Sequence, residues 1–147
     1  MLSSLAPYLV YIEGKMWHTS EHYFQVMKYI KDRPEYATIV ENSAEPMKLG
    51  EETNGVREGW EAIKNEVMFN AIRAKFTQHS DLAKDLLGTG NKDLRLAPKR
   101  TDGIMMNGVL MDVRKYISQN EFPIRPQRET YEDYARDSQG MLIIKFV

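Results

Sequence analysis

The chain has 147 residues, a length typical of a single domain that is stable without disulfides or a structural metal. It contains no cysteine, which excludes disulfide scaffolds, thiol nucleophiles, zinc ribbons and iron–sulfur clusters. The 20 basic and 21 acidic side chains leave a net charge of −1, so no global positive field indicates a nucleic-acid-binding protein. The sequence has no apolar run long enough to span a membrane and no basic, apolar leader, and it favours a cytoplasmic domain.

The first part of the chain predicts a short hairpin followed by a buried helix. Residues 8–12 are rich in aromatic and β-branched side chains, Met16 and Trp17 follow, and Gly14 can supply the turn between the two segments. Thr19 or Ser20 can cap the helix that follows.

The middle of the chain reads as a series of helices. The strongest pattern is a stripe of apolar residues that recur at helical spacing from Trp60 to Ala74. The predicted helices after the first cover residues 35–43, 47–50 (a single turn ending in glycine), 58–77, 81–87 (capped by Ser80) and 105–118.

After Gln119 the composition changes. Thr130 can cap a short helix that reaches Arg136, and the apolar residues 141–147 predict a buried strand. The predicted fold is mainly α: a compact multihelical domain over residues 1–118, with a small β element from the N- and C-terminal segments. Residues 119–147 are expected to form an extension packed on the same domain.

One short motif suggests a metal, but its context argues against that interpretation. His18, Glu21 and His22 have the H-x-x-E-H spacing of inverted zinc peptidases. A zinc site needs both histidines one helical turn apart and a third ligand downstream. A cap at Thr19 or Ser20 places His18 before the helix, so we expect no metal.

Glu21 and His22 remain candidates for chemistry without a metal. A carboxylate in the first helical turn is favoured in its ionised form by the helix dipole, and it could activate water or stabilise a cationic transition state. The alternative is that Glu21 only helps the helix to start. His22 could act as an acid or base near neutral pH, or it could be a hydrogen-bonded, half-buried histidine.

A cationic loop precedes the last predicted helix. This loop could be a solvated surface turn without a specific function. Alternatively, it could be a phosphate clamp, in which the basic side chains and the N-terminus of the following helix bind a phosphate together. The basic residues of this loop are Lys92, Arg95, Lys99 and Arg100.

Several motifs, in the same order, resemble the NADAR (YbiA-like) family. Residues 17–25, WHTSEHYFQ, are similar to its T-x-E-H-Y-F-Q motif, and LSSLAP at 2–7 resembles its L-S-N-F-x-P opening. PMKLG at 46–50 is similar to its P-x-x-A-K-x-L-G segment. The later segments KFTQ, LLGTG and LMDVR resemble its K-F-x-Q-N, L-L-x-T-G and L-M-x-V-R motifs. Each motif is weak alone, but together they are hard to obtain by chance.

The resemblance implies a mostly helical fold and hydrolysis of N-glycosidic bonds without a cofactor. Family activities act on a phosphoribosylamino-pyrimidine of riboflavin synthesis or remove ADP-ribose from guanine bases, so a small nucleotide-like substrate or an ADP-ribosylated nucleic-acid base is expected. Glu21 matches the catalytic glutamate, and Asp102 is expected to assist it. The predicted substrate-binding residues are Ser3, Ser4, His22, Lys48 and Arg100.

The sequence departs from the family pattern between residues 91 and 109, which are shortened and lack its D-x-x-W-G stretch. Asp102 and Gly103 are the candidate remnant. The departure keeps open a lapsed module that binds ADP-ribose or a nucleotide. A further alternative is an assembly protein that uses its C-terminal strand, and the expected state is a monomer or a homodimer.

Overall fold

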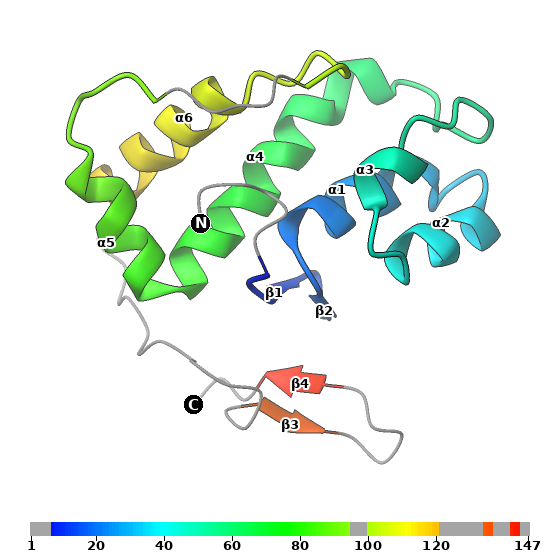
Figure 1. Ribbon diagram of the computed structural model, residues 1–147, viewed down its shortest axis with the longest axis horizontal. Coiled ribbons are helices and arrows are strands. Elements are labelled where there is room, and N and C mark those ends of the chain that lie inside the picture. The colour runs from blue at the N-terminus through cyan, green and yellow to red at the C-terminus, as the bar shows by residue number, and fades with distance from the viewer. Residues whose placement is uncertain (1–6, 95–99, 121–133, 137–141, 145–147) are drawn as a thin grey trace.

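The computed structural model describes residues 7–94, 100–120, 134–136 and 142–144, and helices dominate it (Figure 1). Strands β1 (Val10–Ile12) and β2 (Lys15–Trp17) precede helices α1 (Ser20–Tyr29), α2 (Pro34–Glu41), α3 (Pro46–Leu49), α4 (Trp60–Gln78), α5 (Ser80–Gly88) and α6 (Met106–Gln119), and strands β3 (Tyr134–Arg136) and β4 (Leu142–Ile144) follow. The predicted mainly α fold is confirmed, and the helices predicted before residue 119 agree with the observed ones to within a few residues.

The β1–β2 hairpin forms where the sequence predicts it. Glu13 and Gly14 make the turn with positive φ angles of 54° and 79°, the backbone twist that suits a two-residue antiparallel connection. The hairpin is anchored to the end of α4 because Gln78 both accepts from the Tyr11 N–H, at 2.8 Å, and donates to the Tyr11 carbonyl, at 2.7 Å.

Polar caps and prolines determine where the helices begin. Thr19 is the N-cap of α1, and its hydroxyl accepts the His22 backbone N–H at 3.1 Å. Pro34 and Pro46 occupy the first positions of α2 and α3, where the missing proline N–H is not needed. The expectation that Ser80 caps α5 is wrong by one residue, because His79 occupies the N-cap position.

Helix α4 lies between the pair α5 and α6 and the group formed by α1, α2 and the β1–β2 hairpin (Figure 1). A hydrophobic cluster fills each side of it. On one side it packs with α5 and α6, and Met68, Ile72 and Phe76 are fully buried there. On the other side Ala71 meets a cluster built from the β1–β2 hairpin, α1 and α2. Complete burial of these side chains contributes roughly 1.5–3 kcal/mol for each large apolar residue, and it fixes α1 against α4.

The C-terminal segment corrects one prediction and supports another. The helix expected up to Arg136 is wrong, because Tyr134–Arg136 is strand β3 and pairs antiparallel with β4. Strand formation depends on the pairing partner more than on local propensity, and here 142–144 supplies that partner. The strand expected at 141–147 is present over 142–144. The β element from the two ends of the chain is two separate two-stranded sheets.

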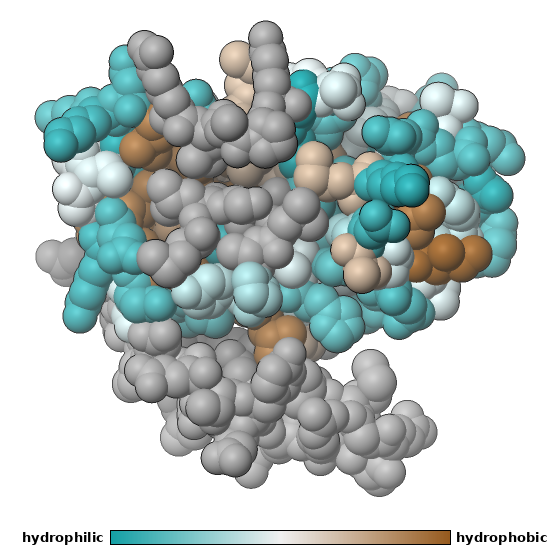
Figure 2. Space-filling model, in the orientation of Figure 1, coloured by the Kyte–Doolittle hydropathy of each residue, from teal (hydrophilic) through white to brown (hydrophobic). Residues whose placement is uncertain are grey.

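Among the residues coloured by hydropathy in Figure 2, hydrophilic ones predominate and the hydrophobic areas are small. The large apolar side chains that are exposed in the described residues lie on different elements: Ile30, Ile39, Leu87 and Met105. No described helix combines the length and the apolar character that crossing a membrane requires.

Candidate active site

Glu21 lies in the first turn of α1 and its side chain is 0% exposed. Its two carboxylate oxygens receive separate hydrogen bonds from one guanidinium: Arg100 Nη1 donates to Oε1 at 2.5 Å and Nη2 donates to Oε2 at 2.9 Å. Gln25, one turn further along α1, donates from Nε2 to Oε2 at 2.8 Å. This bidentate arrangement is the strongest geometry available to an arginine–carboxylate pair, so Glu21 is held in a single orientation.

The same guanidinium also holds Asp102. Arg100 Nη2 donates to Asp102 Oδ2 at 2.7 Å, and Nε donates to the same carboxylate at 3.1 and 3.2 Å. Because Nε, Nη1 and both hydrogens of Nη2 have carboxylate partners, four of the five guanidinium N–H bonds are engaged. Two acids separated by 81 residues of sequence are therefore joined by one cation.

The charges of this cluster stabilise one another. Burial acts to lower the pKa of Arg100, but its hydrogen bonds to Glu21 and Asp102 outweigh burial and raise it. Burial acts to raise the pKa of Asp102, but hydrogen bonds from Arg100 and from the Ile104 N–H outweigh burial and lower it. The Arg100 side chain is only 6% exposed. The cluster is a guanidinium between two carboxylates, and Asp102 is ionised at neutral pH.

Helix α4 positions Asp102. Lys64 Nζ donates to the Asp102 carbonyl at 2.6 Å, and Asp102 Oδ1 accepts the Ile104 N–H at 3.1 Å. Gly103 between them has φ +84°, and a Cβ there would lie 3.1 Å from Lys64 Nζ, so the tight turn favours glycine. Buried Ile104 then fastens the turn to the hydrophobic core.

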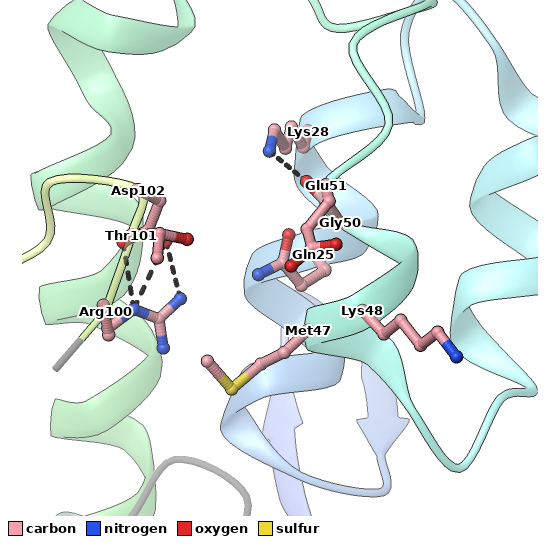
Figure 3. Close-up of a pocket in the computed structure, with 9 residues that line it drawn as sticks. All are labelled: Gln25, Lys28, Met47, Lys48, Gly50, Glu51, Arg100, Thr101 and Asp102. Carbon is pink, nitrogen blue, oxygen red and sulfur yellow. Dashed lines mark hydrogen bonds and ion pairs between the residues drawn. The ribbon is translucent and has the colours of Figure 1, made fainter. Parts of the chain in front are cut away.

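A cleft of about 480 Å³ opens beside the cluster (Figure 3). One wall is α1 together with α3 and the residues that follow it, and the opposite wall is the 100–102 segment. The lining residues are Gln25, Lys28, Met47, Lys48, Gly50, Glu51, Arg100, Thr101 and Asp102. The volume is within the range of small-molecule sites.

The cationic groups of the cleft differ in how they face it. In Figure 3 the Lys28 amine and the Arg100 guanidinium point toward the space between the walls, whereas the exposed Lys48 extends away from it. Lys28 is half-buried and donates to the Gly50 carbonyl at 2.5 Å. Burial lowers the pKa of the Lys28 amine, and nearby Asp102 opposes that effect. Lys28 is therefore the lysine placed to meet an anionic ligand in the cleft.

Gln25 is held between Glu21 and Gly50. A Cβ at residue 50 would lie 2.0 Å from Gln25 Oε1 and 2.4 Å from its Cδ, so the glycine permits this close packing. Gln25 is 3% exposed, and its Oε1 has no hydrogen-bond partner among the described residues. Because Gln25 also lines the cleft, its carbonyl oxygen is an acceptor that a ligand N–H or O–H could satisfy.

Two tyrosines hold the α3 wall in place. The Tyr36 hydroxyl donates to the Leu49 carbonyl at 2.6 Å, and the Tyr29 hydroxyl donates to the Glu52 carbonyl. Their rings pack edge to face, 4.8 Å apart. Helices α1 and α2 thus fix the chain that carries Gly50 and Glu51.

His22 is not among the residues that line this cleft. Its Nε2 contacts the Ser43 carbonyl at 2.7 Å, and its Nδ1 lies 2.8 Å from the Thr19 hydroxyl. Burial lowers the pKa of His22, although the Ser43 carbonyl opposes this effect. The geometry suits a neutral imidazole that joins the start of α1 to the end of α2. His18 precedes the Thr19 cap, as expected, and no group of potential metal ligands converges among the described residues.

The structure therefore brings together three of the residues predicted from sequence: Glu21, Asp102 and Arg100. Lys48 lies at the edge of the cleft, and Ser3 and Ser4 are outside the described residues.

The sequence interpretation did not identify Gln25 and Lys28 as site residues. Their spacing was the available signal, because positions i, i+4 and i+7 from Glu21 lie on one face of a helix. Nothing in local sequence could show that Arg100 binds both acids.

Comparison with known proteins agrees with the motif order. A sequence model of the NADAR domain matches residues 2–104. The chain is 37% identical over 91 residues to "N-glycosidase YbiA" of Escherichia coli, which covers 59% of this chain and 56% of that protein. It is 30% identical over 95 residues to "N-glycosidase Npun_R5314" of Nostoc punctiforme, covering 61% of each. The match to "Riboflavin biosynthesis protein VVA0006" of Vibrio vulnificus is 33% over 96 residues, 64% of this chain and 26% of that protein.

The solved structures give the same picture of the fold. The NMR structure of E. coli YbiA superposes with a TM-score of 0.67 at 30% identity, covering 80% of this chain and 77% of that one. The aligned segment spans less than two-thirds of each curated relative's own length.

Proposed function

The chain belongs to the NADAR domain family, and from this premise we propose that it is an N-glycosidase that hydrolyses the bond between a ribosyl carbon and a base nitrogen. The proposed substrates are ADP-ribosylated or phosphoribosylated bases, such as ADP-ribosyl-guanine. The observation that carries the proposal is the placement of Glu21 and Asp102 on one guanidinium at the edge of a cleft large enough for a nucleotide fragment.

The charges of the site suit the chemistry of this bond. Cleavage of a C1′–N bond develops positive charge on the ribosyl ring, so carboxylates near C1′ lower the barrier. Both acids come from rigid elements, since Glu21 is on α1 and Asp102 is tied to α4 through Lys64. Lys28 and Arg100 supply positive charge for the phosphate groups of the substrate.

In the proposed reaction, water adds to C1′ while the C1′–N bond breaks and its electron pair passes to the base nitrogen. Glu21 accepts a proton from the attacking water, and the departing base nitrogen takes up a proton from solvent, so that one water is consumed for each bond broken. Asp102 acts as an anion near the sugar and holds Arg100. No metal or cofactor enters this scheme.

A second candidate is a catalytically lapsed module that binds ADP-ribose or a nucleotide. One observation favours it: both oxygens of Glu21 are occupied by Arg100 and the side chain is fully buried. A carboxylate so engaged does not reach a substrate until the guanidinium moves.

Measuring turnover and ligand binding on the same proteins distinguishes the N-glycosidase from the lapsed binding module. Wild-type protein is incubated with ADP-ribosylated guanosine and with phosphoribosylated pyrimidine amines, and released base is quantified by chromatography. Glu21→Gln is tested beside it, with Glu66→Gln, an exposed acid on α4, as the matched control. We expect base release by wild type and Glu66→Gln and a loss of at least about a hundredfold in Glu21→Gln.

Calorimetry with ADP-ribose completes the comparison. Binding without turnover of any substrate supports the lapsed module and contradicts the enzyme. An absence of both binding and turnover contradicts both candidates.

A further inference from the structure

Arg100 separates Glu21 from the cleft. The guanidinium lines the cleft, whereas Glu21 is 0% exposed and lies on the other side of the contact that Arg100 makes. A ligand in the cleft meets Arg100 first. In the described conformation, the acid proposed to act on the sugar is covered by the cation proposed to meet the phosphate.

The two contacts of Arg100 differ in how readily they can be exchanged. Asp102 is only two residues away, binds both Nε and Nη2, and is fixed by Lys64 and by the Ile104 N–H. Glu21 is on another element and binds the ends of the guanidinium, Nη1 and Nη2. The guanidinium can therefore turn away from Glu21 while Nε remains on Asp102.

We propose that Arg100 exchanges Glu21 for a phosphate group of the substrate, and that this exchange makes the site selective for ribosyl substrates that carry a phosphate or diphosphate. A phosphate offers the guanidinium the same bidentate acceptor geometry as a carboxylate. The exchange leaves Glu21 facing the sugar, where developing positive charge at C1′ takes the place of the departed cation. This inference rests on the proposed function, because it assigns the phosphate and the sugar to the two sides of the cluster.

The exchange explains why both parts of the substrate are needed. A phosphate alone would draw Arg100 away and leave Glu21 as a buried, uncompensated anion, which is strongly unfavourable. A sugar without phosphate offers the guanidinium no alternative partner, so Glu21 stays covered. A phosphorylated ribosyl group satisfies both charges at once. Specificity is then expressed in the rate of the chemical step as well as in binding.

The exchange can be tested without any turnover by measuring the affinity for inorganic pyrophosphate calorimetrically. Four proteins are compared: wild type, Glu21→Gln, Glu51→Gln, and the double variant Glu21→Gln with Arg100→Gln. Glu51 lines the same cleft, so its substitution reports the general effect of removing one negative charge. The double variant removes both buried charges and avoids leaving either one unpaired.

We expect Glu21→Gln to bind pyrophosphate on the order of tenfold more tightly than wild type, because Arg100 no longer has a competing anion. The affinity of Glu51→Gln for pyrophosphate should increase only about twofold, which is the size expected for removing one screened charge. The double variant should lose the gain, since its guanidinium is absent.

Equal gains in Glu21→Gln and Glu51→Gln, or a gain that survives in the double variant, would overturn the exchange. Pyrophosphate is not a substrate, so this result is independent of hydrolysis. A tenfold gain in a protein that releases no base keeps the exchange and contradicts the enzyme. Base release together with equal gains keeps the enzyme and contradicts the exchange.

Discussion

Arg100 and Lys75 are both buried basic side chains, but their pKa values are shifted in opposite directions. Arg100 is 6% exposed and binds two carboxylates, which outweigh burial and raise its pKa. Lys75, on α4, is 0% exposed, and its amine lies 5.6 Å from the centroid of the Tyr8 ring and 5.5 Å from that of Phe76. Burial lowers the pKa of Lys75 to about 8.

The difference shows that the groups around a buried basic side chain decide how readily it loses its charge. Arg100 keeps its charge because acids from two elements compensate it, and this compensated cluster borders a cleft. The amine of Lys75 lies near two aromatic rings, and burial lowers its pKa far enough that it loses its proton at mildly alkaline pH.

Removal of Arg100 should produce the largest effect on stability. Arg100→Gln leaves Glu21 buried without its cation, and breaking one partner of a buried ion pair typically loses 3–5 kcal/mol, so we expect a loss of about 3–5 kcal/mol in the free energy of unfolding. Urea unfolding monitored by circular dichroism measures it.

Adding Glu21→Gln to that variant should recover much of the loss, because no buried anion remains. If Arg100→Gln unfolds at the wild-type urea concentration, the cluster does not hold the two segments together.

This cluster also marks the limit of what the sequence could predict. The motif around Glu21 and the Thr19 cap gave the start of α1, and the stripe from Trp60 gave α4, because both signals are local. The bond between Glu21 and Arg100 joins residues 79 positions apart, and no periodicity encodes such a pairing.

The other features that the sequence did not predict also depend on contacts between distant segments. Lys28 enters the cleft only because α3 and the 100–102 segment pack around α1. Residues 134–136 became a strand because a pairing partner lies at 142–144, and local propensity could not show that.

The titration of Lys75 should produce the next largest effect. Its folded pKa of about 8 lies below its ordinary value of 10.5, so between these values the unfolded chain binds more protons and stability rises with pH. We expect the free energy of unfolding to increase by about 2 kcal/mol from about pH 7.5 to pH 9.5.

The matched control is Lys75→Met, whose stability should stay nearly level over that range. The rise in stability should end near pH 10. Burial raises the pKa of Tyr23 to about 12, so above pH 10 tyrosine ionises more readily in the unfolded chain than in the folded one, and this lowers the free energy of unfolding. An equal rise in the variant would show that Lys75 is not the titrating group.

A methyl group at residue 50 should have a smaller effect. In Gly50→Ala the new Cβ meets Gln25 Oε1, so the Gln25 side chain must turn and lose its bond to Glu21. We expect a loss of about 1–2 kcal/mol, measured as a shift in the urea midpoint. Gly88→Ala, where a Cβ meets nothing within 4 Å, is the control and should not destabilise. Equal effects would contradict the close packing of Gln25.

Acid pH should show the smallest effect. The pKa of Asp102 is lowered in the folded state, so its contribution is complete above its ordinary value of 3.8 and is lost as pH falls through the lower folded value. Asp102→Asn should therefore lose less stability than wild type when the pH is lowered from about 5 to 2.5. Thermal unfolding across that range measures both proteins, and parallel losses would place Asp102 outside the buried network.

The central claim is that the ribosyl carbon binds beside Glu21 with its phosphate on Arg100. The most direct measurement is a crystal structure of the Glu21→Gln chain with ADP-ribose. We expect the ribose in the cleft, C1′ within about 3.5–4 Å of the side chain at position 21, and a phosphate oxygen on the Arg100 guanidinium. ADP-ribose bound away from α1, or with C1′ turned from position 21 toward solvent, would contradict it.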